Sequence, residues 1–115
     1  MEISHFHVYV KNRSKAVEWL KKVWYVTPVE EDHEMSMFTF GSIAIIINDS
    51  EEDVPSTIAF GSKDCDHDYE DVIARGAISI QEPENKPWGV RIAFVQGPGK
   101  LTFEIEEVLQ KNKRS

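Results

Sequence analysis

The order of expected strands and helices is the same in the two halves of this 115-residue chain. Strand-like segments and one capped helix give strand, helix and three further strands before residue 50, and the same order returns after residue 54. A shift of 52 residues places Lys11 on Lys63 and Glu18 on Glu70, and a shift of 58 places Gly41 on Gly99. The repetition predicts an internal duplication.

Hydrophobic periodicity predicts the elements of module one, residues 1–50. Asn12 or Ser14 can cap a helix whose apolar positions recur at helical spacing, and Pro28 ends it. The acidic cluster from Glu30 to Glu34 is expected to be a solvated turn, because its spacing builds no cation cage. The expected strands lie at residues 3–10, in the stretch after residue 28, at 35–40 and at 43–48, and residues 49–55 form a linker.

Module two, residues 54–108, repeats this order. Asp64 can cap a helix over residues 65–75 with an acidic first turn, and Gly76 ends it. Cys65 is not expected to be a nucleophile, because carboxylates surround it and no general base is evident. The other expected elements are strands at 57–60, 78–80, 90–95 and 101–105, a loop at 82–87, a final helix at 106–113 and a C-terminal tail at 109–115.

Alternation along the strands assigns a face of the sheet to each side chain. The apolar face should pack under the helices and comprises Phe6, Val8, Val10, Phe38, Phe40, Ile58, Phe60, Ile92, Phe94, Leu101, Phe103 and Ile105. The opposite face has the usual composition of a small-molecule site and comprises His5, His7, Tyr9, Met37, Thr39, Thr57, Arg91, Thr102, Glu104 and Glu106. The simpler alternative is a solvated face of an antiparallel sheet.

Several segments resemble the vicinal oxygen chelate superfamily, also called the glyoxalase/bleomycin-resistance/dioxygenase group. Residues 5–12 (HFHVYVKN) are similar to its opening strand, and residues 57–60 (TIAF) and 74–77 (ARGA) to the start of its second module. Residues 87–91 (PWGVR) and 97–105 are similar to its closing hairpin and final glutamate strand. Trp24 departs from the family pattern, since it stands in the region of the usual Leu-Gly.

The resemblance covers residues 1 to about 107, nearly the whole chain. It implies an α+β fold in which two βαβββ modules form a curled mixed sheet around a cavity, with the helices on the outer face. It further implies one glyoxalase/bleomycin-resistance-like domain over residues 1–115 and a homodimer as the common assembly.

Metal-using members of that superfamily hold the ion with four ligands from the first and last strands of two modules. By the resemblance, His5 and Glu104 occupy two of these positions, whereas Thr57 and Ile46 occupy the others. A catalytic divalent metal needs about three or four suitable protein ligands, so neither a metal nor another cofactor is favoured, and any metal would use His5 and Glu104. His7 lies ~6.6 Å further along the strand, so it could complete the set only through an unusual bend.

Charge and cysteine counts restrict the partners. The net charge of −7, from 13 basic and 20 acidic residues, disfavours nucleic acid and anionic membrane surfaces. The basic tail (Lys111, Lys113, Arg114) is expected to be solvated. The single cysteine, the absence of a secretory signal and a longest apolar run of only residues 43–47 favour a cytoplasmic protein that does not span a membrane.

The favoured function is a small-molecule binding protein of the glyoxalase/bleomycin-resistance type without an intact metal centre. A neutral or cationic ligand suits the acidic chain. Its predicted contacts are His5, His7, Tyr9, Met37, Thr57, Trp88, Arg91, Thr102 and Glu104. The alternatives are a metal-dependent lyase, isomerase or dioxygenase that uses His5 and Glu104, and a regulatory module whose cavity is closed.

Overall fold

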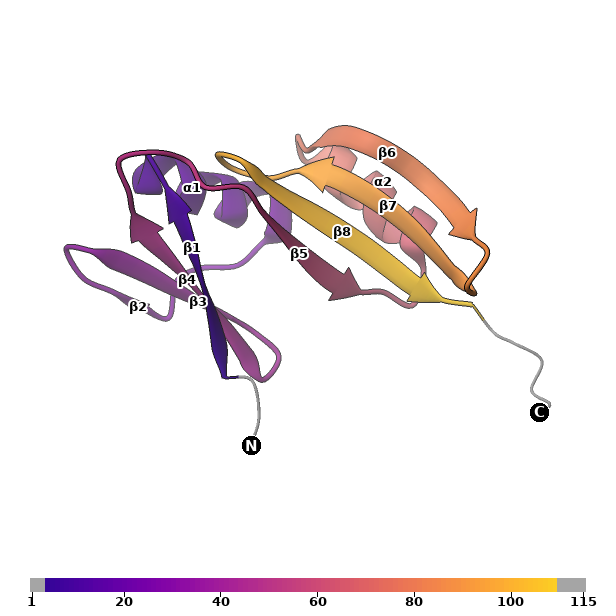
Figure 1. Ribbon diagram of the computed structural model, residues 1–115, viewed down its shortest axis with the longest axis horizontal. Coiled ribbons are helices and arrows are strands. Elements are labelled where there is room, and N and C mark those ends of the chain that lie inside the picture. Colours follow the sequence, from indigo (N-terminus) through magenta and orange to yellow (C-terminus); the bar gives the residue numbers. More distant parts are fainter. Residues whose placement is uncertain (1–3, 110–115) are drawn as a thin grey trace. The chain divides into compact units, whose positions relative to one another are not determined.

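The computed structural model describes residues 4–109, which form two compact units. The first unit runs to Ser56 and includes the Pro98–Lys100 turn, and the second comprises Thr57–Gly97 and the chain from Leu101 onward. Each unit has a four-stranded sheet with a helix on one face (Figure 1). Both units follow the order βαβββ, so the two predicted βαβββ modules are confirmed, in two four-stranded sheets.

The first unit begins with β1 (His5–Val10), which leads into α1 (Arg13–Trp19). The Asn12 side chain caps this helix by accepting a hydrogen bond from the backbone N–H of Lys15 at 3.1 Å. The strands β2 (Glu30–Glu31), β3 (Met35–Phe40) and β4 (Ile43–Asp49) follow. The sheet order is β1-β4-β3-β2, with β1 parallel to β4 and β3 antiparallel to both its neighbours.

The first helical segment ends earlier than Pro28, contrary to the prediction. After α1 the chain continues as a π-helical turn, η1 (Leu20–Trp24), and Tyr25 then takes a left-handed conformation with φ 57° and ψ 40°. The N–H of Tyr25 bonds to the carbonyl of Leu20 and closes the turn. A left-handed residue turns the chain away from the helix axis, so the helix stops there without a proline.

The remaining elements are β5 (Ser56–Gly61), α2 (Cys65–Ala74), β6 (Ile78–Lys86), β7 (Val90–Gln96) and β8 (Leu101–Val108), in the sheet order β5-β8-β7-β6. All of them lie in the second unit, apart from the first residue of β5. The predicted cap is present, since Asp64 accepts a hydrogen bond from the N–H of His67 at 3.1 Å. None of the described helices is long and apolar enough to cross a membrane.

Two predicted element boundaries in this unit are wrong. The expected loop at 82–87 is mostly strand, because β6 continues to Lys86 through irregularities between Ser79 and Gln81 and between Gln81 and Glu84. Bulges of this kind break the alternation that reveals a strand, and the edge position of β6 tolerates Pro83. The expected final helix at 106–113 is wrong at its start, because β8 continues to Val108. Residues 110–113 and the basic tail lie outside the described residues.

Each sheet buries one face beneath its own helix. Alternate residues of β1 and β4 provide the core of the first unit, and those of β7 and β8 provide the core of the second. The buried apolar side chains include Val8, Val10, Leu20, Phe38, Ile47, Ala93, Val95, Leu101, Phe103 and Ile105. Phe6, predicted to be buried, is 47% exposed near the start of β1.

Candidate functional site

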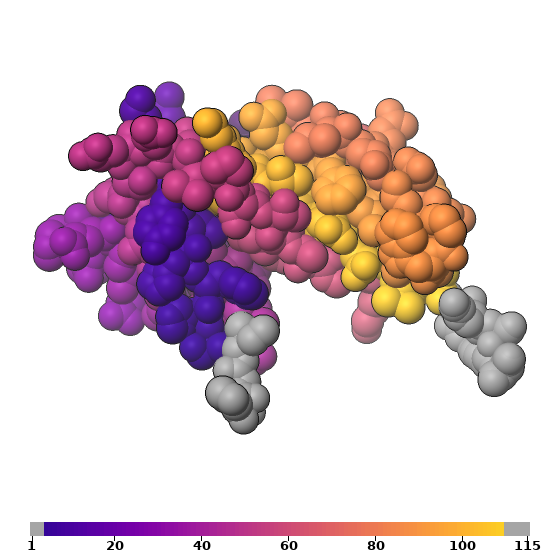
Figure 2. Space-filling model, in the orientation of Figure 1, coloured from indigo at the N-terminus to yellow at the C-terminus, as the bar shows by residue number. Residues whose placement is uncertain are grey.

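The helix-free face of the first sheet carries the predicted polar residues of β1. His5, His7 and Tyr9 are exposed, whereas the intervening Val8 and the following Val10 are buried. This alternation follows from strand geometry, because successive side chains point to opposite faces. Figure 2 shows the side chains of β1, in indigo, on the visible surface of this unit.

The aromatic rings of β1 form a continuous row. The centroids of His5 and His7 lie 5.0 Å apart in an edge-to-face arrangement, and those of His7 and Tyr9 lie 6.4 Å apart and are stacked. The two imidazoles therefore lie in contact along one face of β1. Such a row offers both flat apolar faces and polar ring edges to a ligand.

Asn48 orients the central ring of this row, and the sequence did not single it out. Its carbonyl oxygen Oδ1 lies 2.9 Å from Nδ1 of His7. Because Oδ1 can only accept, Nδ1 carries the proton, and Nε2 of a neutral ring is then left with its lone pair for a ligand. Asn48 is a polar interruption at the end of the apolar run of β4, which is the signal that could have found it.

An apolar floor completes the helix-free face of the first unit. Ile46 in β4 is the register partner of both His7 in β1 and Met37 in β3. These three side chains therefore cross the sheet side by side on one face. Met37 is half-buried, as expected of an adaptable side chain in a binding surface.

The helix-free face of the second sheet combines carboxylates with apolar side chains. Glu104 in β8 pairs with Phe94 in β7, and Glu106 pairs with Ile92. Burial raises the pKa of Glu104 above its ordinary value of 4.5, and the neighbouring charge of Glu106 raises it further. Thr102 lies on the same face, opposite Gln96.

The predicted faces of β7 are reversed. Ala93 and Val95 are fully buried on the helix side, so Ile92 and Phe94 lie on the helix-free face with the glutamates. Arg91, predicted to share the face of Glu104, lies on the helix side instead. There Asp66, in the first turn of α2, holds its guanidinium with contacts of 2.8 and 3.0 Å.

This ion pair satisfies Arg91 within its own unit. The guanidinium also donates a hydrogen bond to Asn85 at 2.9 Å, so β6, β7 and α2 are tied together. Hydrogen bonds from Arg91 lower the pKa of Asp66 below its ordinary value of 3.8. A bidentate carboxylate partner leaves the arginine less suited to anchor a ligand.

The two remaining predicted contacts lie at exposed positions of the second unit. Thr57 is exposed on β5, and Trp88 is 67% exposed in the turn between β6 and β7.

The donors on these faces do not fit a metal ion held by three or four ligands. Ile46, the partner of His7, presents hydrocarbon where the resemblance would require a ligand. Among residues 4–109, the donors close enough to share one ion are on α2 instead: His67, Asp68 and Asp71, with ligand atoms within 4.8 Å of one another. Neither His5 nor Glu104 belongs to such a group.

Solved structures provide the comparison with known proteins. A glyoxalase/bleomycin resistance protein/dioxygenase from Nocardioides matches with a TM-score of 0.85 and 18% identity, over 100% of this chain and 88% of that one. The bleomycin resistance determinant encoded on the transposon Tn5 matches with a TM-score of 0.78 and 11% identity, over 93% of this chain and 98% of that one. This is the vicinal oxygen chelate fold.

The solved structures with this fold include one of a family enzyme. This glyoxalase/bleomycin resistance protein/dioxygenase family enzyme from Burkholderia phytofirmans PsJN has a TM-score of 0.74 and 16% identity, over 95% of this chain and 100% of that one. No family model matches the sequence, and no curated protein matches it. The fold predicted from the resemblance is confirmed, and the roles of individual residues must be argued from this chain's own geometry.

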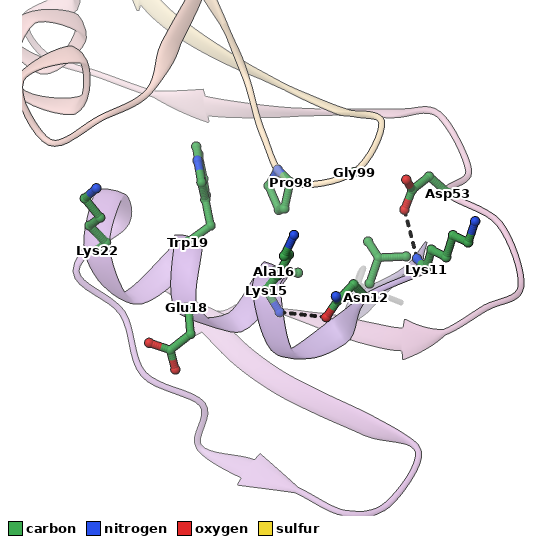
Figure 3. A pocket seen from close by; sticks show the side chains of 11 residues that line it. Lys11, Asn12, Lys15, Ala16, Glu18, Trp19, Lys22, Asp53, Pro98 and Gly99 are labelled. Carbon is green, nitrogen blue, oxygen red and sulfur yellow. Dashed lines mark hydrogen bonds between the residues drawn. The ribbon is translucent and has the colours of Figure 1, made fainter.

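A groove on α1, lined by none of the predicted ligand contacts, was missed by the sequence analysis. It has a volume of about 780 Å³, and Lys15, Ala16, Trp19 and Lys22 line it from the helical segment (Figure 3). The spacing of Lys15, Trp19 and Lys22 is the sequence signal that could have found it, because it places them along one side of a helix. The apolar residues on the adjacent side of the helix form the core, and they dominate the helical pattern of this segment.

Proposed function

We propose that this chain is a small-molecule binding protein whose ligand contacts the helix-free face of the first sheet without a metal centre. The observation that carries the proposal is the row of His5, His7 and Tyr9 rings, which lies beside the apolar floor of Ile46 and Met37. A few oriented polar groups over apolar walls are typical of small-molecule sites.

Taken separately, the helix-free face of each unit favours a neutral or cationic aromatic ligand. The first unit offers stacking surfaces and the Nε2 lone pair of His7, and the second offers Glu104, Glu106 and Thr102. Carboxylates next to Ile92 and Phe94 attract a cation that also carries an apolar body. In this proposal the face of Arg91 plays no part.

The proposal is tested with naphthylmethylammonium, a cationic aromatic probe, by calorimetry and by the shift in Tm. Binding to the native state should raise Tm, and His7→Ala should weaken binding about tenfold, since it removes a central stacking ring. His33→Ala is the matched control, because His33 belongs to the same unit but its side chain is 88% exposed and lies 3.8 Å from Glu34. Equal binding by wild type and His7→Ala would contradict the proposal.

Metal analysis of the purified chain separates this function from the metal-dependent enzyme. We expect no stoichiometric divalent metal. Stoichiometric zinc, nickel, manganese or iron that is lost on His5→Ala would instead favour a lyase, isomerase or dioxygenase that uses His5 and Glu104. A homodimer and a cytoplasmic location stay predictions, and sedimentation measures the first of them.

A further inference from the structure

Positive charge is concentrated on one short segment of an otherwise acidic chain. Residues 11–22 hold five of the 13 basic residues and one of the 20 acidic residues. The segment comprises the turn after β1, α1 and the start of η1, and it borders the groove described above. A local field of this sign attracts anions that the rest of the chain repels.

The walls of the groove are apolar. Ala16 and Trp19 form the helix side, Val10 contributes from β1, and Pro98 faces them from the Pro98–Lys100 turn (Figure 3). Trp19 is half-buried and stacks on Trp24, with ring centroids 5.9 Å apart at 25°, which holds the indole in place as a wall. A volume of about 780 Å³ suits a small organic molecule.

The rim of the groove is cationic. Lys11, Lys15 and Lys22 line it and are exposed, so their ammonium groups can reach a bound anion. Two acidic residues also line it. Glu18 points away from Trp19 and Pro98 in Figure 3 and lies 3.6 Å from Lys21.

The second acidic residue, Asp53, is held by the backbone. Its Oδ1 accepts a hydrogen bond from the N–H of Lys11 at 2.8 Å, and the same oxygen fits against Gly99. One rim carboxylate therefore faces three lysines, and the balance of charge at the rim is positive.

We propose that this groove is a second binding site, which takes a small aromatic carboxylate. The flat ring lies against Trp19 and Pro98, and the carboxylate lies toward Lys15 and Lys22. Charge complementarity and the apolar walls are both required, because exposed lysines alone hold an anion weakly. The site does not depend on the function proposed above, which concerns the sheet faces and the opposite ligand charge.

The test uses naphthoate, with naphthamide as its uncharged analogue, titrated into the full chain and followed by amide chemical shifts. Naphthoate should shift the signals of α1 and bind about tenfold more tightly than naphthamide, since each unit charge contributes about 1 kcal/mol at 4 Å in water. Added salt should weaken the binding of naphthoate and leave that of naphthamide unchanged.

Charge reversal locates the site. Lys15→Glu with Lys22→Glu should weaken naphthoate at least about tenfold, and the milder Lys15→Gln with Lys22→Gln should give an intermediate loss. Lys21→Glu is the control for one charge reversal, half the change of the double variant, on a neighbouring residue that does not line the groove. Its effect should stay within about twofold, since screening limits charges outside the groove.

Four results would overturn the proposal. They are undiminished naphthoate binding in the doubly reversed variant, an equal loss in Lys21→Glu, equal affinity for naphthamide, and shifts confined to β1 and β8. A sedimentation run covers the other possible occupant, because dimerisation that competes with naphthoate would assign the groove to a second copy. Failure here leaves the naphthylmethylammonium result at His7 unaffected, so the two proposals fail separately.

Discussion

Alanine at Gly99 should destabilise the chain more than alanine at Gly41, although both glycines have nearly the same backbone conformation. Their φ angles are +62° and +64°. A Cβ at Gly41 meets no atom within 4 Å, whereas a Cβ at Gly99 lies 2.7 Å from Oδ1 of Asp53 and 3.0 Å from its Cγ. The pair thus separates the cost of the left-handed conformation from the cost of a steric contact.

The magnitudes follow from these two terms. A non-glycine residue in the left-handed region costs about 1–2 kcal/mol, and this applies to both positions. At Gly99 the Asp53 carboxylate must also move and weaken its hydrogen bond from Lys11, which is 2.8 Å long. Loss of a hydrogen bond to a charged group adds about 1–2 kcal/mol at an exposed site, so Gly99→Ala should cost about 2–4 kcal/mol in total.

Urea unfolding measures both variants. With a slope of roughly 1–2 kcal/mol per molar for a small chain, the extra cost at Gly99 should lower the midpoint by about 1 M relative to Gly41→Ala. In an Asp53→Ala background the extra cost should disappear, because the clash and the hydrogen bond are both gone. Equal losses for the two alanines, or an unchanged loss at Gly99 without Asp53, would refute the reasoning.

Three further predictions concern buried polarity and charge. Ser36→Ala should cost about 2 kcal/mol in urea unfolding, because the fully buried hydroxyl bonds two charged side chains, and a loss under about 0.5 kcal/mol would contradict this. Asp66 has a lowered pKa through Arg91, so its stabilisation is present above its ordinary pKa of 3.8 and is lost as pH falls through the folded value. Asp66→Asn should therefore flatten the acid limb of a stability–pH curve, and an unaltered limb would exclude the ion pair as its cause. The pKa of Glu104 is raised, so stability should fall as pH rises from below 4.5 through the folded value, and Glu104→Gln should abolish that fall.

Local signals in the sequence predicted much of the fold. Both helix caps, Asn12 and Asp64, are present, because a cap depends on a hydrogen bond between residues three apart. The alternation of β1 correctly placed His5, His7 and Tyr9 on one exposed face, since that strand is regular and one-sided. The duplication is likewise readable from the order of elements alone.

The errors lie where a contact with a distant residue overrides the local pattern. The segment around Arg91 is apolar on both sides, so polarity alone placed the arginine on the outer face. Asp66, 25 residues away, pairs with Arg91 on the helix side. Because side chains alternate along a strand, the other side chains of β7 also lie on the opposite face from the one predicted. The bulges of β6 hid the strand in the same way, because they form only against β7.

The sequence by itself therefore determined the duplicated βαβββ order, the capped helix starts and the histidine-bearing face of β1, because each depends on neighbours within one turn or strand. Only the tertiary structure decided that Asn48 orients His7 and that Arg91 forms an ion pair with Asp66. It also decided that Lys15, Trp19 and Lys22 border a groove. Strand register and the packing of a turn against a helix bring these groups together, and neither is encoded in the spacing of any single segment.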